Sequence, residues 1–271
     1  SILWGIFILI LIKWKLKGEW IESKGEKYDL TGTIIYGISL LAVSSGFLQL
    51  PSLGGTILIG VGILGLFSFG CYEVRTHAPL MEIGIFQKNR VFTFSSISAL
   101  INYSAVYAVG FLMSLYLQYI KNMPPGQAGL TLIVQPTVQA IVSPLTGRLS
   151  DRFEPGRVAS LGMLLTVSAL SGMVFLGENT GLGFVIGCLL LLGLGLAVFI
   201  SPNANAIMSS VDKQFYGLAS GIMATMRFIG QMLSMSVSMI ILSIYVGKTE
   251  IIANKLPQFL QSAKANFTVM V

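Results

Sequence analysis

Five charges of both signs fall within eleven residues of this chain, in the segment 147–157. Long apolar segments flank the charged residues, which are Arg148, Asp151, Arg152, Glu154 and Arg157. Because charges at the centre of a bilayer are costly, we expect this segment to lie at a membrane surface. A carboxylate at a helix end is stabilised by the positive end of a neighbouring helix, and arginines donate charge-assisted hydrogen bonds. These residues can therefore make a contact between helices; an ordinary solvated loop is the alternative.

Another charge, Arg227, lies inside the apolar segment 216–246. An arginine near mid-membrane costs roughly 2.5–3.5 kcal/mol to insert, so its side chain should face protein or water and have a partner. All eleven acidic residues fall at connectors or helix ends. We therefore expect Arg227 to bind backbone carbonyls, an acid outside this chain, or a substrate.

Polar and aromatic stripes with helical spacing mark two further apolar segments, 91–119 and 127–146. Residues four apart share one face of a helix. Such a face either packs against a neighbouring helix or lines a water-filled cavity, and aromatic rings attract lipophilic cations. Both interpretations stay open, and the candidates for a substrate cavity are Asn102, Tyr103, Tyr107, Phe111, Gln135, Gln139 and Arg227.

Signatures of enzymes and of metal sites are missing from the sequence. It contains no phosphate-binding loop, nucleophile elbow or zinc motif. Its single histidine, His77, has no second metal ligand at suitable spacing. We predict a protein that is not an enzyme and that needs neither a metal nor another cofactor. The +6 formal charge sits mostly in short connectors, which favours anionic lipid headgroups over nucleic acid.

Composition predicts an all-α, multi-pass membrane protein. Charged residues make up 10% of the chain and hydrophobic residues 54%, whereas charged residues are about 25% of a soluble domain. The run 1–12 is too short to cross a bilayer, and we interpret it as a partial membrane helix. Seven apolar segments are long enough to cross: 29–50, 54–73, 91–119, 127–146, 157–177, 181–203 and 216–246.

Basic residues are distributed unequally between alternate connectors. The connectors 13–28, 73–90, 147–157 and 204–215 hold twelve Lys and Arg residues, and the opposite set holds four. Because Lys and Arg are enriched in cytoplasmic loops, we predict that the first set is cytoplasmic.

Local patterns also predict helix capping and close helix packing. Asp29 precedes an apolar run and is expected to cap a helix. Gly183 with Gly187, and Gly217 with Gly221, have the spacing of small residues at close helix contacts.

The order Gly147-x-Leu149-x-Asp151-Arg152 resembles the signature loop of the major facilitator superfamily. In that family the loop joins the second and third helices of a six-helix half and latches the two halves on the cytoplasmic side. One departure is Glu154, where the family usually has glycine. The resemblance implies a latch against the absent N-terminal half, formed by Gly147, Arg148, Asp151, Arg152 and Arg157.

Other segments resemble the EmrB/QacA-type drug:proton antiporters, which have fourteen helices: 28–32, 78–81, 86–90, 193–195 and 217–221. The resemblance implies five regions along the chain. These are the end of helix six (1–12), a cytoplasmic loop (13–28), an inserted helix pair (29–73), a cytoplasmic linker (74–90) and the C-terminal transporter half (91–271). Within that half, we expect a polar tail over 247–266 and only the first turn of a truncated helix over 267–271.

As for function, the resemblance implies a secondary active transporter in the cell membrane, which works by alternating access. It would export drug-like lipophilic or cationic small molecules in exchange for protons. The acid that carries the proton would lie outside this chain or be a connector acid such as Asp212. A transporter of a specific metabolite and a non-transporting membrane scaffold are the alternatives. The implied partners are the substrate, protons, the lipid bilayer and the N-terminal half.

Overall fold

The computed structural model describes Gly5, Leu11 and residues 29–76, 86, 88–247 and 255–271. Regular structure in this part of the chain is helical, and no strand occurs in it. The predicted partial helix 1–12 apart from Gly5 and Leu11, the loop 13–28 and most of the linker 74–90 lie outside the described residues.

Seven helical segments of the described chain are long and apolar enough to cross a membrane. Their bounds agree with the predicted segments within a few residues, which confirms an all-α, multi-pass membrane protein. The helices are α2 (Leu30–Leu48), α3 (Leu53–Glu73), α5 (Arg90–Val106), α6 (Val109–Leu115) with the π-helical turn η1 (Tyr116–Ile120), α7 (Pro125–Leu132), α8 (Val134–Ser150), α9 (Pro155–Val174), α10 (Leu182–Ser209), the 3₁₀ turn η2 (Lys213–Phe215), α11 (Tyr216–Val246) and α12 (Leu256–Met270).

Capping side chains and prolines mark the starts of several helices. The carboxylate of Asp29 accepts a hydrogen bond from the amide of Gly32 at 2.9 Å, which confirms the predicted cap of α2. Asn89 accepts from the amide of Phe92 at 3.0 Å in the same way at the start of α5. Each bond satisfies an amide that has no partner within its helix.

The signature segment is more helical than the sequence suggested. Helix α8 continues through Pro144 to Ser150, and α9 begins at Pro155, so the predicted connector of eleven residues, 147–157, is a turn of four. Two hydrogen bonds explain the extension: Thr146 Oγ1 donates to the carbonyl of Ala197 on α10 at 2.7 Å, and Ser150 Oγ donates to the carbonyl of Gly147 at 2.7 Å.

The expected polar tail was also wrong, because α12 begins at Leu256 rather than near residue 267. The apolar residues of its buried face are Phe259, Ala263, Phe267 and Met270. These residues recur at helical spacing, and the glutamines and lysine between them hid the pattern.

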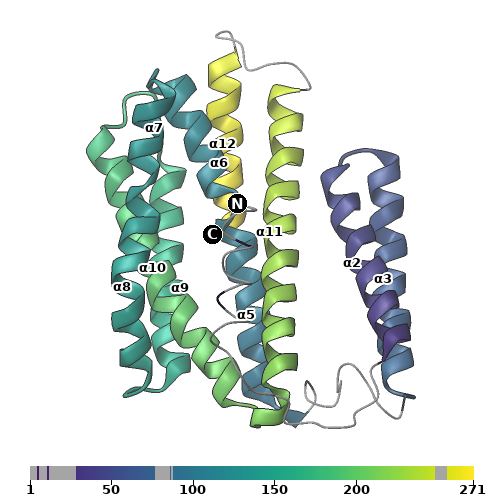
Figure 1. Ribbon diagram of the computed structural model, residues 1–271. Coiled ribbons are helices and arrows are strands. Elements are labelled where there is room, and N and C mark those ends of the chain that lie inside the picture. The colour runs from purple at the N-terminus through teal and green to yellow at the C-terminus, as the bar shows by residue number, and fades with distance from the viewer. Residues whose placement is uncertain (1–4, 6–10, 12–28, 77–85, 87, 248–254) are drawn as a thin grey trace.

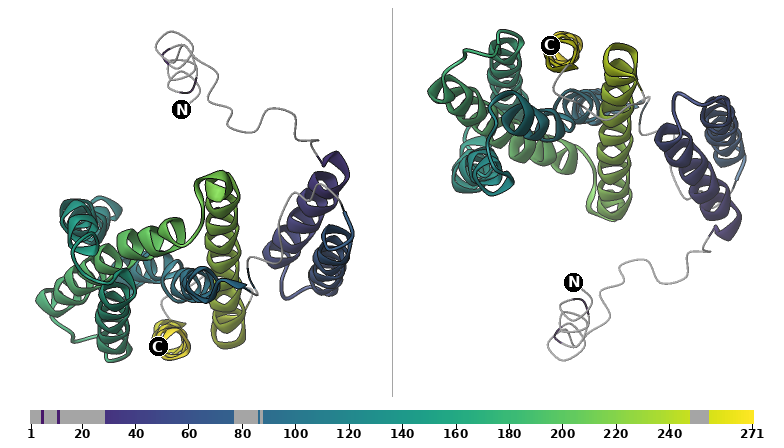
Figure 2. Two further views of the ribbon diagram at one scale, coloured as in Figure 1. Left: turned by 90° about the horizontal axis from the view of Figure 1, so that it is seen from below. Right: turned by 90° about the horizontal axis from the view of Figure 1, so that it is seen from above.

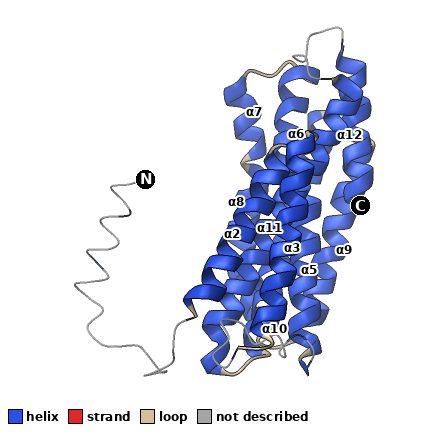
Figure 3. Ribbon diagram, turned by 90° about the vertical axis from the view of Figure 1, so that its right-hand side faces the viewer, coloured by secondary structure: helices blue, strands red, loops and turns tan. Residues whose placement is uncertain are grey.

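The helices form one bundle with the α2–α3 pair at its side (Figure 1). End-on views show α12 beside α11 and α5, and the α2–α3 pair next to α11 (Figure 2). Long helices run along a common direction when the molecule is seen from the side (Figure 3). The largest core lies among α6, η1, α9, α10 and α12 and includes the fully buried Leu112, Tyr116, Leu170, Phe259 and Phe267.

Close helix crossings depend on glycines other than the predicted ones. A Cβ at Gly162 of α9 would overlap the backbone of α10 at Val198, and one at Gly230 of α11 would lie 2.6 Å from the carbonyl oxygen of Leu100 on α5. By contrast, Gly183, Gly187, Gly217 and Gly221 have no neighbour within 4 Å of such an atom. Spacing alone does not say which face of a helix meets another helix.

Two hydrogen bonds attach the α2–α3 pair to the bundle. The hydroxyls of Tyr36 and Thr225 are 2.5 Å apart, and Ser236 Oγ donates to the carbonyl of Phe47 at 3.1 Å. Both join α2 to α11 across nearly 190 positions of sequence. The pair is therefore anchored along one face of α11.

Candidate functional site

Two membrane-length helices, 90–120 and 125–150, each contain a local irregularity. Between α5 and α6 the backbone stays in the α-helical region at Tyr107 and Ala108, but the Ala108 amide donates to Ser234 Oγ of α11 at 3.0 Å. Between α7 and α8 the backbone at Ile133 also stays helical and keeps its hydrogen bonds to Gly129 and Thr137. Residues on both sides of these two positions line one cavity of about 240 Å³.

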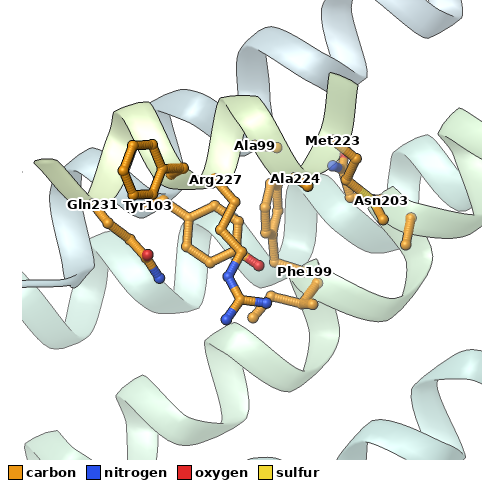
Figure 4. Close-up of a pocket in the computed structure, with 11 residues that line it drawn as sticks. Ala99, Tyr103, Phe199, Asn203, Met223, Ala224, Arg227 and Gln231 are labelled. Atoms are coloured by element: carbon orange, nitrogen blue, oxygen red, sulfur yellow. The ribbon is translucent and has the colours of Figure 1, made fainter. Parts of the chain in front are cut away.

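An adjoining cavity of about 370 Å³ lies among α5, α10 and α11 (Figure 4). Its polar lining consists of Tyr103, Asn203, Arg227 and Gln231. Tyr103 and Gln231 also line the first cavity. The two hollows thus meet at these side chains, and we refer to them together as the central cavity.

Arg227 extends from α11 into the central cavity beside the ring of Tyr103 on α5 (Figure 4). Its guanidinium carbon is 5.7 Å from the centroid of that ring, within the range of a cation–π interaction. Among the described residues Arg227 has no acidic partner. The ring of Tyr103 therefore serves as at least part of the partner that we expected for the Arg227 side chain.

Amide side chains supply the remaining polarity of the central cavity. Gln135 Nε2 donates to Gln139 Oε1 at 3.1 Å on one face of α8. Asn203 Nδ2 donates to the carbonyl of Ser95 at 3.1 Å. Sequence reasoning missed Asn203 and Gln231; Gln231 lies one helical turn after Arg227, and that spacing could have indicated it.

Of the remaining cavity candidates, Tyr107 lines the central cavity, and Asn102 and Phe111 lie outside it. Asn102 is fully buried, and its Nδ2 is 3.4 Å from the sulfur of Met163 on α9, so it does not line the central cavity. Tyr107 lies at the boundary with a separate, lateral cavity of about 520 Å³ between α2, α6 and α11. Phe111 lines only this lateral cavity, together with methionines such as Met235.

Residues of the predicted latch lie in and beside the α8–α9 turn. Asp151 is exposed, and its carboxylate is 3.4 Å from Asn205 Nδ2 of α10, which also donates to Ser150 Oγ at 2.7 Å. Arg157 pairs with Glu154 at 2.7 Å, with both side chains largely in solvent. Arg148 and Arg152 are exposed. The turn thus holds Asp151 at the surface, on the side of the bundle where α10 and α11 join (Figure 1).

One buried acid was missed by sequence reasoning. Glu73 ends α3 and is only 3% exposed, and its carboxylate lies against Gly32 together with that of Asp29. The hydroxyl of Tyr72 donates to Asp29 at 3.2 Å. Both acids are at helix ends, as expected, but at the base of the α2–α3 pair rather than in the central cavity.

Residues 95–250 match the sequence profile of the Major Facilitator Superfamily. The chain belongs to this superfamily. The match covers α6–α11 and most of α5, which includes every residue of the central cavity. It confirms the resemblance that the signature segment indicated.

Relatives within the superfamily include proteins named for resistance and export. The chain is 30% identical over 211 residues to the riboflavin transporter RibZ of Clostridioides difficile, covering 76% of this chain and 45% of the relative. It is 26% identical over 231 residues to the tetracenomycin C resistance and export protein of Streptomyces glaucescens (83% and 43%). It is 25% identical over 233 residues to the multidrug resistance protein Stp of Mycobacterium tuberculosis (84% and 43%). The chain spans less than half the length of these relatives.

Proposed function

We propose that this chain supplies the C-terminal half of a secondary active transporter that exports drug-like lipophilic small molecules by alternating access. The observation that carries the proposal is the central cavity, into which Arg227 extends from an otherwise apolar membrane segment. A charged side chain within a membrane segment typically marks a substrate pathway, and transporter substrate sites lie near the midplane of the bilayer. Names of the superfamily relatives support the class of substrate.

In this proposal a second helical bundle, the N-terminal half, closes the other side of the central cavity. Asp151, with Arg148, Arg152 and Arg157 around it, contacts that half on the cytoplasmic side and holds this side closed while the cavity opens outward. The connectors 13–28, 73–90, 147–157 and 204–215 are cytoplasmic. The protein lies in the cell membrane, and proton entry drives export through an acid outside the described lining of the cavity.

A second candidate is a transporter of one specific metabolite, which the similarity to a riboflavin transporter favours. The two candidates differ in the range of compounds that the transporter accepts.

Export is tested in cells that lack their own drug exporters and express the transporter with both halves. We expect the neutral dye Nile red to accumulate less than in vector-only cells, and a protonophore to abolish this difference. Equal accumulation in both cell lines contradicts export. Export that persists with the protonophore contradicts proton coupling but leaves the export function standing. Export of riboflavin but of no dye favours the metabolite transporter.

A further inference from the structure

Arg227 is the only residue with a formal charge among the described residues that line the central cavity. The rest of the lining consists of apolar side chains, tyrosines and amides. Because the cavity lies at membrane depth, its surroundings screen this charge less than bulk water would. The half of the site that this chain supplies is therefore electropositive.

One aromatic face that could attract a cationic substrate, the ring of Tyr103, is already occupied; the rings of Tyr107, Phe199 and Phe228 also line the central cavity. Tyr103 is the aromatic residue common to both parts of the central cavity, and the Arg227 guanidinium lies 5.7 Å from its ring centroid. A cationic ligand on this ring would have to displace Arg227 and would then lie beside a like charge. Both effects oppose the binding of a lipophilic cation at this position.

Hydrogen-bond donors in the cavity also favour an anion. Arginine presents up to five N–H donors in a planar fork that matches a carboxylate or a similar oxyanion. Gln231 lies one turn along α11 and lines the same cavity, so its amide can donate to the same ligand. Apolar side chains such as Phe199 and Ile200 surround these donors and can contact an apolar body.

We propose that the transporter prefers organic anions, namely compounds with an apolar, mostly aromatic body and one ionised acidic group that binds Arg227. This preference rests on the proposed export function and narrows its substrates. It replaces the prediction made from the sequence, in which the aromatic stripe of α5 binds lipophilic cations.

The test uses two fluorescent dyes with a common xanthene core, the anionic fluorescein and the cationic rhodamine 123. Binding to the purified, detergent-solubilised transporter with both halves is measured by fluorescence polarisation. We expect fluorescein to bind about tenfold more tightly or better, the scale of one charge-assisted hydrogen bond. Equal binding, or tighter binding of rhodamine 123, overturns the proposal.

Two variants assign the preference to Arg227. In Arg227→Gln, which removes the charge and keeps a donor, fluorescein binding should weaken about tenfold while rhodamine 123 binding stays equal or strengthens. Arg227→Lys, which keeps the charge but loses the planar fork, should retain part of the preference. Loss of binding for both dyes in Arg227→Gln, with an unchanged melting temperature, overturns the assignment. If this variant does not fold, the comparison in the unmodified protein and in Arg227→Lys decides.

Nile red separates the failure of this inference from the failure of the export function. If cells export Nile red but the purified protein shows no preference for fluorescein, export stands and anion selectivity is wrong. If the protein prefers fluorescein but cells export none of the three dyes, the cavity binds anions and the export function is wrong.

Discussion

At the scale of residues, Arg227 and Tyr103 hold the chemistry of the central cavity. A charge at membrane depth requires a partner, and the ring of Tyr103 is one that the described structure supplies. The contact between the two side chains also sets the position of the Arg227 guanidinium in the cavity, and hence its position relative to a bound ligand.

We therefore expect Tyr103→Leu to lower the free energy of unfolding by about 0.5–2 kcal/mol, the value of a cation–π contact, whereas Tyr103→Phe, which keeps the ring, should lose little of it. In an Arg227→Gln background the difference between Leu and Phe at this position should disappear, because the charge is gone. The measurement is thermal unfolding in detergent. The same difference in both backgrounds would mean that the ring contributes packing alone.

Most of the polar residues that line the central cavity could be predicted from the sequence, because helical spacing places them on common helix faces. Five residues were expected in a cavity and line the central cavity: Tyr103, Tyr107, Gln135, Gln139 and Arg227. Asn102 belongs to the same polar and aromatic stripe of α5 but is buried against Met163 of α9. The stripe is wider than the part of α5 that lines the cavity, so its edge packs against α9. Gln231 and Asn203 were missed because no pattern marked them before the helices were assembled.

At the scale of elements, the irregularity between α5 and α6 and the glycine contacts depend on partners far away in sequence. The Ala108 amide at this irregularity donates to Ser234 of α11, more than 120 residues away. No local signal in 91–119 contains that information. The sequence around Gly162 likewise does not show that this glycine lies against the backbone of α10.

Gly162→Ala should therefore destabilise the protein, and Gly187→Ala is the matched control. The added methyl at Gly162 would overlap the backbone at Val198, and we expect a cost of about 1–3 kcal/mol. At Gly187 there is open space, and replacing glycine by alanine in a helix should be neutral or favourable by up to about 1 kcal/mol. Thermal midpoints in detergent measure both. If the two variants shift the midpoint equally, α9 and α10 do not cross closely at Gly162.

At the scale of the whole molecule, we propose that the bundle meets another bundle. The central cavity is walled by α5, α6, α8, α10 and α11, and the Asp151 turn projects at the end of the bundle where α10 joins α11 (Figure 1). The proposed account is that this half rocks against its partner, so that the cavity faces each side of the membrane in turn and Asp151 stabilises the outward-facing state.

The most direct test of this account is the accessibility of a cysteine at Gln231, in a transporter with both halves whose native cysteines, including Cys71 and Cys188, are replaced by alanine. Its reaction with a membrane-impermeant thiol reagent is measured separately from each side. We predict reaction from both sides. Asp151→Asn should raise the rate from the cytoplasm and lower it from outside, whereas Glu178→Gln, at the opposite end of the bundle, should change neither. Reaction from one side only, or equal rates with and without Asp151→Asn, would contradict the account.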